Sequence, residues 1–168
     1  MEAFPFNLRK ATVEDIPLIR EMSFQIWPAT YSEILTPEQM KYMLDLLYSP
    51  HSLLDQMAQQ HEFIIVQQDK TPVGFASFSL VEPGIYKLHK LYMLPVTQGK
   101  GAGKYVINEI LSRVKEKGAR SLILNVNRHN KAKDFYERMG FAILKEEDVD
   151  IGNGYFMNDY IMQKKIEG

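Results

Sequence analysis

One glycine-rich turn constrains this chain more than any other segment. It follows an apolar run of strand-type residues that ends at a proline, and a helical pattern begins directly after it. Gly99, Gly101 and Gly103 let the main chain approach a ligand closely, because no Cβ atom stands in the way. A helix that begins here directs unpaired N–H groups and its positive dipole end toward an anion. Since Lys100 and Lys104 add positive charge, the segment predicts a phosphate-binding site.

Two common nucleotide-binding patterns do not fit this turn. The P-loop requires a glycine where Gln98 stands and a hydroxyl side chain where Tyr105 stands. The dinucleotide-binding fingerprint, counted from Gly99, requires its third glycine where Lys104 stands. The alternative without a ligand is an ordinary glycine-rich connection between a strand and a helix. The rest of the chain has to decide between them.

Composition narrows the class of protein. The 168 residues, 45% hydrophobic and 24% charged, predict one globular domain over 1–168 with its core at about 7–166. A net charge of −1 gives no support for nucleic acid as a partner. The absence of cysteine excludes disulfides, thiolate metal sites and an acyl-cysteine mechanism, and the histidines are scattered, so no metal is expected. Without a signal peptide or a membrane-spanning apolar run, we expect a cytoplasmic protein with no membrane partner.

Hydrophobic periodicity and capping residues predict a mixed α/β chain. Helices are expected over 12–23 or 15–23, over 36–48 and 52–60, from the glycine turn to 118, and over 130–140. Strands are expected over 7–9, 63–68, 73–80, 85–93, 122–126, 141–149 and 155–164. Pro17 favours Asp15 over Thr12 as the cap of the first helix, because proline belongs in the first helical turn.

Two motifs of this chain resemble those of the GCN5-related N-acetyltransferases. The pattern Gln98-x-x-Gly101-x-Gly103 is similar to the family's pyrophosphate-binding signature, Gln/Arg-x-x-Gly-x-Gly/Ala. The stretch 127–141 is similar to the closing motif, Asn-x-x-Ala-x-x-x-Tyr-x-x-x-Gly-Phe. The stretch 8–16 also resembles the family's first strand and helix. The resemblance covers nearly the whole chain and implies the family's fold, an α/β (α+β) single domain with a central mixed, mostly antiparallel sheet flanked by helices.

The closing motif departs from the family pattern in one place. The nearest asparagine, Asn130, stands two residues before Ala132, and His129 holds the position three before it. Either Asn130 or Asn127 is therefore expected to make the contact that the family's asparagine makes. Asn127 would bind through its side chain or main chain, and Asn130 also fits as the cap of the last helix.

The resemblance implies acetyl-CoA (coenzyme A) as the cofactor and the transfer of its acetyl group to an amine. Cofactor contacts are expected from the strand before the glycine turn, from the turn and from the closing motif: Leu91, Tyr92, Met93, Gln98, Gly99, Lys100, Gly101, Ala102, Gly103, Lys104, Asn127, Asn130, Lys133 and Tyr136. A main-chain N–H near Met93 is expected to stabilise the developing oxyanion. For Lys133, the alternative is a solvated surface lysine.

Tyr136 and His89 are the candidate catalytic residues. By resemblance, Tyr136 protonates the departing thiolate, and the alternative is a core tyrosine, because the residue falls on the apolar face of its helix. Strand alternation places His89 on the face of Leu91 and Met93, and a histidine has a suitable pKa for accepting the amine proton. A water relay to a carboxylate or to the main chain is the alternative base. Lys87 is expected to act only through its charge.

The acceptor pocket is expected near Trp27 and Tyr31, between the first two helices, although core packing explains both residues equally well. The tail 150–160 resembles that of bacterial members near the spermidine/spermine acetyltransferases. Carboxylates in or beside it could attract a cationic amine, although a charge run is usually a solvated face: Glu146, Glu147, Asp148 and Asp150. The expected acceptor is a small-molecule amine, with a polyamine among the candidates.

Two alternatives to a small-molecule acetyltransferase remain. One is a peptide or protein N-terminal acetyltransferase, which is expected to present an open groove. The other is a non-catalytic acyl-CoA-binding regulatory module, which would need the glycine turn but no general acid. Homodimers are common in the family, and no residue of this sequence indicates an interface.

Overall fold

The computed structural model describes residues 5–167, and these fall into two compact units. Unit 1 holds the described residues up to Ser79 together with Lys90–Glu109. Unit 2 holds Leu80–His89 and the described residues from Ile110 onward. Strand β4 (Ile85–Met93) and helix α4 (Ala102–Glu116) therefore contribute to both units.

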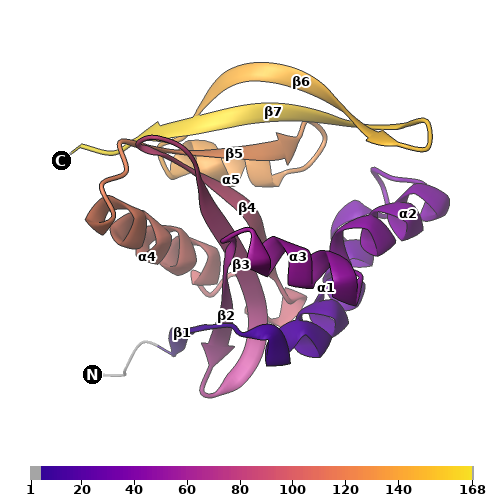
Figure 1. The fold of residues 1–168 in the computed structure, drawn as a ribbon, viewed down its shortest axis with the longest axis horizontal. Helices are drawn as coiled ribbons and strands as arrows, with labels where there is room; N and C mark the ends of the chain where they lie inside the picture. Colours follow the sequence, from indigo (N-terminus) through magenta and orange to yellow (C-terminus); the bar gives the residue numbers. More distant parts are fainter. Residues whose placement is uncertain (1–4, 168) are drawn as a thin grey trace. The chain divides into compact units, whose positions relative to one another are not determined.

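The other elements follow in the order that the sequence predicts. They are β1 (Phe6–Lys10), α1 (Ile16–Tyr31), α2 (Pro37–Tyr48), α3 (Pro50–Ala58), β2 (Glu62–Gln68), β3 (Thr71–Glu82), β5 (Ser121–Asn127), α5 (Ala132–Arg138), β6 (Ala142–Gly152) and β7 (Tyr155–Lys165), with short 3₁₀ turns at Val13–Asp15 and Pro95–Thr97 (Figure 1). The mixed α/β class is thus confirmed. Within residues 5–167, no helix is both long and apolar enough to cross a membrane.

The sheet of unit 1 has the strand order β1-β2-β3-β4. Strands β1, β2 and β3 are antiparallel, with Leu8 opposite Val66 and Ile64 opposite Ala76. The apolar run from Phe63 to Val66 is completely buried, as expected of a strand covered on both faces. This run anchors the core of unit 1.

Aromatic side chains join α1 and α2 to this sheet. The Trp27 ring of α1 lies 4.6 Å from Tyr31, 5.7 Å from Tyr48 of α2 and 5.8 Å from Tyr92 of β4. Tyr48 in turn contacts Phe75 of β3 with a 5.9 Å ring separation. Such tilted and edge-on pairs contribute about 0.5–1.5 kcal/mol each beyond the area that they bury. The cluster fixes the position of α1 against the end of β4.

The first helix begins where the sequence predicts, directly after Asp15, but it ends later than predicted. Thr12 caps the 3₁₀ turn, accepting a hydrogen bond from the Glu14 N–H, and α1 begins after Asp15 with proline in its first turn. The helix then continues through Pro28 to Tyr31, well beyond the predicted end at residue 23. A proline inside a helix removes one N–H donor, a cost that tertiary packing can offset. Burial of Trp27 and Tyr31 on the inner face of α1 supplies that packing.

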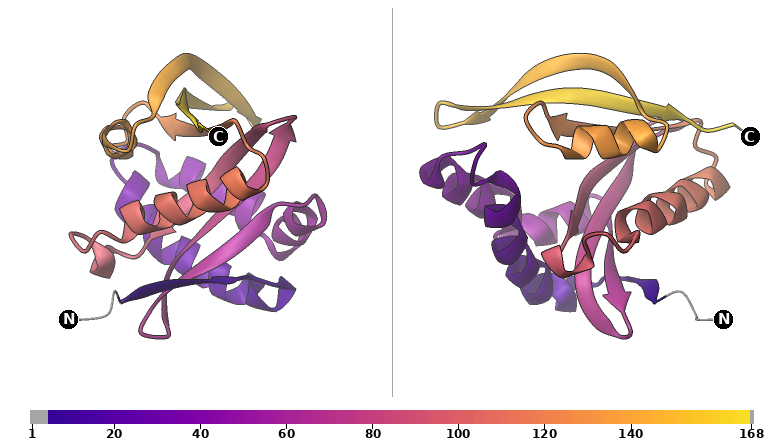
Figure 2. Two further views of the ribbon diagram at one scale, coloured as in Figure 1. Left: turned by 90° about the vertical axis from the view of Figure 1, so that its left-hand side faces the viewer. Right: turned by 180° about the vertical axis from the view of Figure 1, so that it is seen from behind.

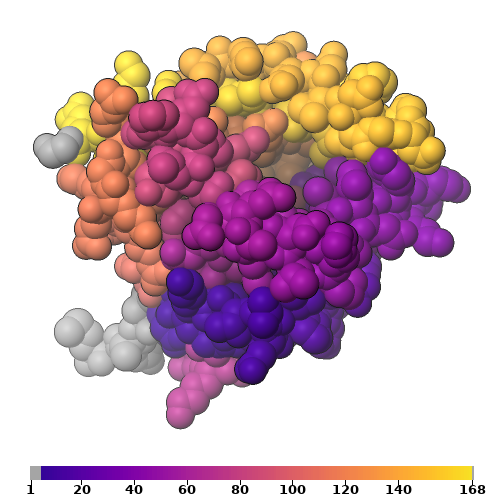
Figure 3. Space-filling view, viewed as in Figure 1, coloured from indigo at the N-terminus to yellow at the C-terminus, as the bar shows by residue number. Residues whose placement is uncertain are grey.

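The sheet of unit 2 has the strand order β4-β5-β7-β6. The first half of β4 is parallel to β5, while β5, β7 and β6 are antiparallel neighbours. Helix α5 packs on β5, and β6 and β7 form a long hairpin (Figure 2). Strand β6 is exposed from residue 142 to 148, and its surface is seen along the top of Figure 3. Charged side chains suit such an edge, because they oppose pairing with another chain.

Candidate active site

The glycine turn has the local geometry that a phosphate cradle requires. Gly99 and Gly101 have φ angles of 78° and 75°, in the left-handed region where a side chain is strained. A Cβ atom at either position would meet nothing within 4 Å, so open space lies in front of the turn. Gly103 lies inside the first turn of α4. The φ angles, rather than lack of room, therefore explain glycine at 99 and 101.

The start of α4 contains main-chain N–H groups that precede the helical ladder. The N–H of Tyr105 donates to the Gly101 carbonyl at 3.1 Å, which is the first bond of the helical ladder. The amides between these two residues are the ones that a helix N-terminus leaves without intrahelical partners. Lys100 and Lys104 are exposed beside them. Open space, free amides and two cations fit the pyrophosphate of coenzyme A.

The end of β4 is held closely against β3 in unit 1. The Leu94 N–H donates to the Val73 carbonyl at 2.7 Å. A Cβ atom at Gly74 would lie 2.5 Å from the Met93 sulfur and 2.6 Å from the Tyr92 carbonyl oxygen. Gly74 therefore allows the predicted cofactor residues of β4 to lie where they do.

The asparagines of the closing motif both make local hydrogen bonds in unit 2. Asn127 Oδ1 accepts from the His129 N–H at 2.9 Å, and Asn130 Oδ1 accepts from the Ala132 N–H at 2.9 Å. The predicted capping role of Asn130 is thus present at the start of α5. Asn127 is 6% exposed, so it helps to fix the turn between β5 and α5 from the inside.

Tyr136 lies on the buried side of α5. Its ring is 5.2 Å from Phe135 and 5.6 Å from Phe141, and the residue is 8% exposed. The ring packing expected of a core tyrosine is therefore present. A buried ring also fixes the direction of its hydroxyl, which a general acid requires. The two readings do not exclude each other.

Lys133 and His89, two further predicted site residues, lie in unit 2. Lys133 pairs with Glu137 at 2.8 Å and lies over the Tyr160 ring, with its nitrogen 5.8 Å from the ring centroid. The hydrogen bond to Glu137 raises the pKa of Lys133, so this lysine stays charged. His89 is half-buried on β4. Among the described residues, no group of three or more acidic or histidine side chains is arranged to hold a metal ion.

Trp27 and Tyr31 lie within α1, not between the first two helices. They are 2% and 6% exposed, and the Tyr31 and Tyr92 hydroxyls are hydrogen-bonded at 2.9 Å. The structure thus brings together two predicted acceptor residues and one predicted cofactor residue within unit 1. Their rings pack as the core reading expects.

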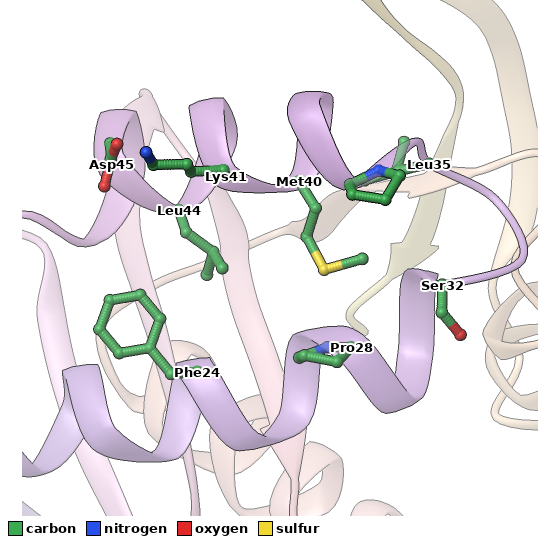
Figure 4. Close-up of a pocket in the computed structure, with 9 residues that line it drawn as sticks. Phe24, Pro28, Ser32, Leu35, Met40, Lys41, Leu44 and Asp45 are labelled. Carbon is green, nitrogen blue, oxygen red and sulfur yellow. The ribbon is translucent and has the colours of Figure 1, made fainter.

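A pocket of about 510 Å³ lies on another face of α1, between α1 and α2 (Figure 4). Apolar side chains such as Phe24, Pro28 and Leu44 line it, with Lys41 and Asp45 among the lining residues. Trp27 and Tyr31 do not line it, because their rings pack in the aromatic cluster, although each immediately precedes a lining residue, Pro28 or Ser32. None of the residues that the sequence singled out lines this pocket.

Arg128 engages part of the acidic run on β6. It donates to Glu146 at 3.0 Å and forms a second, short ion pair with Asp148. Asp150 accepts a hydrogen bond from the Gly152 N–H at 2.8 Å, so it stabilises the hairpin turn. Three of the four carboxylates that were expected to attract a cationic amine thus have partners within unit 2. Their existing partners leave these three less able to attract an amine.

Sequence reasoning missed the carboxylate of Asp159 on β7. It is 6% exposed, and its Oδ2 accepts a hydrogen bond from the Asn125 side chain at 3.2 Å. Burial, the largest effect, raises the pKa of Asp159 above its ordinary value. A signal was present, because Asn125 and Asn127 interrupt an otherwise apolar strand on alternate positions.

Comparisons with known proteins agree with this geometry. The family profile described as "Acetyltransferase (GNAT) domain" matches residues 31–160. Spermidine N(1)-acetyltransferase of Thermoplasma acidophilum is 29% identical over 167 residues, covering 96% of this chain and 98% of that protein. The [ribosomal protein bS18]-alanine N-acetyltransferase of Haemophilus influenzae is 36% identical, but over only 69 residues, 41% of this chain and 44% of that protein.

A solved structure extends the agreement to the fold and the cofactor. The crystal structure of PaiA N-acetyltransferase from Thermoplasma acidophilum, in complex with coenzyme A, superposes with a TM-score of 0.81 and 28% identity. The match covers 96% of this chain and 99% of that one. The chain belongs to the acetyltransferase (GNAT) domain family, and it is an acetyl-CoA-dependent N-acetyltransferase. The predicted fold and cofactor are therefore confirmed.

Proposed function

We propose that this enzyme transfers the acetyl group of acetyl-CoA to a primary amine of a small molecule, with a polyamine as the favoured acceptor. The observation that carries this proposal is the end-to-end similarity to a spermidine N(1)-acetyltransferase, which covers nearly all of both chains. The similarity to a ribosomal-protein acetyltransferase covers less than half of each chain. A protein N-terminus is therefore the second candidate.

The turn of unit 1 is proposed to hold the cofactor. The N–H groups around Gly101 and the exposed Lys100 and Lys104 would bind the pyrophosphate. The main chain of Leu91–Met93 would pair with the pantetheine arm. A main-chain N–H near Met93 would stabilise the negative charge that develops on the carbonyl oxygen, a role worth about 3–4 kcal/mol in other enzymes.

The proposed chemistry is direct attack in a ternary complex. Acetyl-CoA supplies the acetyl group as a thioester, whose carbonyl carbon forms the new bond to the amine nitrogen as the carbon–sulfur bond breaks. The Tyr136 hydroxyl donates its proton to the departing sulfur. The proton that leaves the amine goes to His89, or through water to another base. Asn127 and Asn130 support this arrangement by fixing the turn that leads into α5.

Thiol release from acetyl-CoA, measured against a panel of amines, tests the proposal. Spermidine, diamines, amino acids, aminoglycosides and peptides with alanine at the N-terminus would each be supplied at saturating acetyl-CoA. We expect the highest kcat/KM with a small aliphatic amine. Turnover of the peptides alone would overturn the small-molecule acceptor in favour of the N-terminal one.

A further inference from the structure

A polar face of the unit 2 sheet carries a carboxylate that the proposed chemistry does not use. In the strand register, Asp159 on β7 lies opposite Asn127 on β5 and opposite Glu147 on β6. Directly paired residues of antiparallel strands point to the same side, so these three side chains share one face. The next residue along β7, Tyr160, contacts Lys133 of α5. Helix α5 therefore covers the opposite face.

Asp159 has one carboxylate oxygen without a partner. Asn125 satisfies Oδ2, whereas Oδ1 is buried and accepts no hydrogen bond from any residue in the described part of the chain. Burial raises the pKa of this carboxyl group. The Asn125 hydrogen bond and the charges of Lys87 and Arg128 lower it, and the charge of Glu147 raises it. Buried polar atoms normally have a partner, so this oxygen keeps an unused capacity to accept a hydrogen bond.

The neighbouring cations do not supply that donor. Arg128 is bound to Glu146 and Asp148 on β6. Lys87 of β4 acts on Asp159 through its charge, and no ion pair joins the two side chains among the residues that the structure describes. Asp159 is therefore a fixed carboxylate with one oxygen that accepts no hydrogen bond and with no cationic side chain paired to it among the described residues.

We propose that Asp159 Oδ1 binds an ammonium group of the acceptor, namely the one that is not acetylated. An ammonium group offers three donors and one positive charge, which match what this buried carboxylate lacks. The nitrogen that attacks the thioester must be neutral, so a carboxylate that favours the charged form suits the distal amine. This inference rests on the proposed function and makes its acceptor a diamine or polyamine.

Two amines of equal length test the proposal. Pentylamine matches 1,4-diaminobutane atom for atom, except that a methyl group replaces one ammonium. For the unaltered enzyme, we expect the diamine to have a KM lower by about tenfold or more, the usual value of a hydrogen bond to a charged group. In Asp159→Asn, the two KM values should become equal, with kcat for pentylamine and the KM for acetyl-CoA unchanged. Asp69→Asn is the matched control, because Asp69 lies exposed in the β2–β3 turn with a φ of 49°, which asparagine tolerates.

A structural role for Asp159 would give a different result. It would lower kcat/KM equally for both amines, and either that outcome or an intact diamine preference in Asp159→Asn overturns the proposal. The substitution is also expected to preserve or raise the unfolding free energy at pH 7, because it removes a buried, incompletely paired charge. A large loss of unfolding free energy would likewise contradict a binding role.

Failure of the proposed function is distinguishable from failure of this inference. If the enzyme acetylates peptides but none of the small amines, the proposed acceptor is wrong. Calorimetry then tests whether Asp159 binds an ammonium group. Spermidine is titrated into the coenzyme A complex of the unaltered protein and into that of Asp159→Asn. Binding that only the unaltered protein shows would support the site. Equal binding by both proteins, or binding by neither, would overturn it.

Discussion

The two units of this enzyme differ in the chemical groups that are proposed to bind ligands. In unit 1, open space lies in front of Gly99 and Gly101, the lysines of the turn are exposed, and the groups proposed to bind are main-chain amides. In unit 2, Tyr136 and Asp159 present side chains that are more than nine-tenths buried. The geometry of the turn does not depend on tertiary contacts, because two φ angles and the start of a helix define it. The unit 2 groups gain their properties only from what packs around them.

This difference predicts how each region responds to substitution. A main-chain site tolerates changes in side-chain chemistry and fails when a backbone angle is lost. A site built from buried side chains is disrupted when a packed ring is lost. Its chemistry alone can be removed by deleting a single atom, such as the hydroxyl oxygen of Tyr136. Substitutions in the two units should therefore separate cofactor binding from catalysis.

The largest effect is expected from Tyr136→Phe in unit 2. The change deletes the hydroxyl and keeps the ring that packs on Phe135 and Phe141, so the fold and the Kd for acetyl-CoA should be preserved. If the hydroxyl is the general acid, kcat falls by about 100-fold. Steady-state kinetics and calorimetry measure the two quantities. Tyr86→Phe is the control on β4, and an unchanged kcat in Tyr136→Phe would leave Tyr136 as a core residue.

Gly101→Val is designed to disrupt the glycine turn of unit 1. A branched side chain at a φ of 75° is strained, and relief of that strain moves the amides of the turn. We expect the Kd for coenzyme A to rise about thirtyfold through loss of charge-assisted hydrogen bonds.

Gly118→Val is the matched control for that substitution. Gly118 has a φ of 90° and equally open surroundings at the other end of α4, so it carries similar strain away from the turn. It should lose stability but keep its affinity for coenzyme A. Equal affinities in the two variants would mean that the turn does not bind the cofactor.

Gly74→Ala tests a main-chain contact inside unit 1, because it adds a methyl group where β3 packs closely against β4. The added methyl group would collide with the Tyr92 carbonyl oxygen, which cannot move without its strand. Overpacking of this kind lowers the unfolding free energy by about 1–2 kcal/mol. Denaturant unfolding measures that loss, and an unchanged midpoint would show that β3 and β4 can separate freely at this point.

The smallest effect is expected from Asp15→Asn, which contrasts a paired carboxylate with Asp159. Arg9 donates two hydrogen bonds to Asp15, at 2.8 and 2.9 Å, and this pairing lowers the pKa of Asp15. The stabilisation is therefore complete above the ordinary pKa of 3.8 and is lost as the pH falls through the lowered value. Because Arg9 is partly exposed, the loss at pH 7 should be only about 0.5–1 kcal/mol.

Asp159 should show the opposite pH dependence. Its pKa is raised in the folded state, so its ionised form opposes folding above that pKa, and the penalty decreases as the pH falls through it. Unfolding free energies of both Asp→Asn variants, measured between pH 3 and pH 8 relative to the unaltered protein, should change in opposite directions. The same direction for both variants would contradict the assigned environments.

Several features could be predicted from the sequence because they depend on residues close together in the chain. The capping hydrogen bond of Asn130, the strand before the glycine turn and the helix after it are all present in the structure. The end of α1 was predicted wrongly, because the helix continues to Tyr31 even through Pro28, where burial of Trp27 and Tyr31 stabilises it. The assignments of catalytic and binding roles stay predictions.

The element order, the glycine turn and, through two motifs, the family all follow from the amino-acid sequence. These depend on backbone angles and helix starts, which neighbouring residues control. The tertiary structure placed Trp27 and Tyr31 in the aromatic core, and within residues 5–167 it gave one oxygen of Asp159 no hydrogen-bond partner. Burial and hydrogen-bond pairing depend on strands and helices that are far apart in the chain, so no local pattern can specify them.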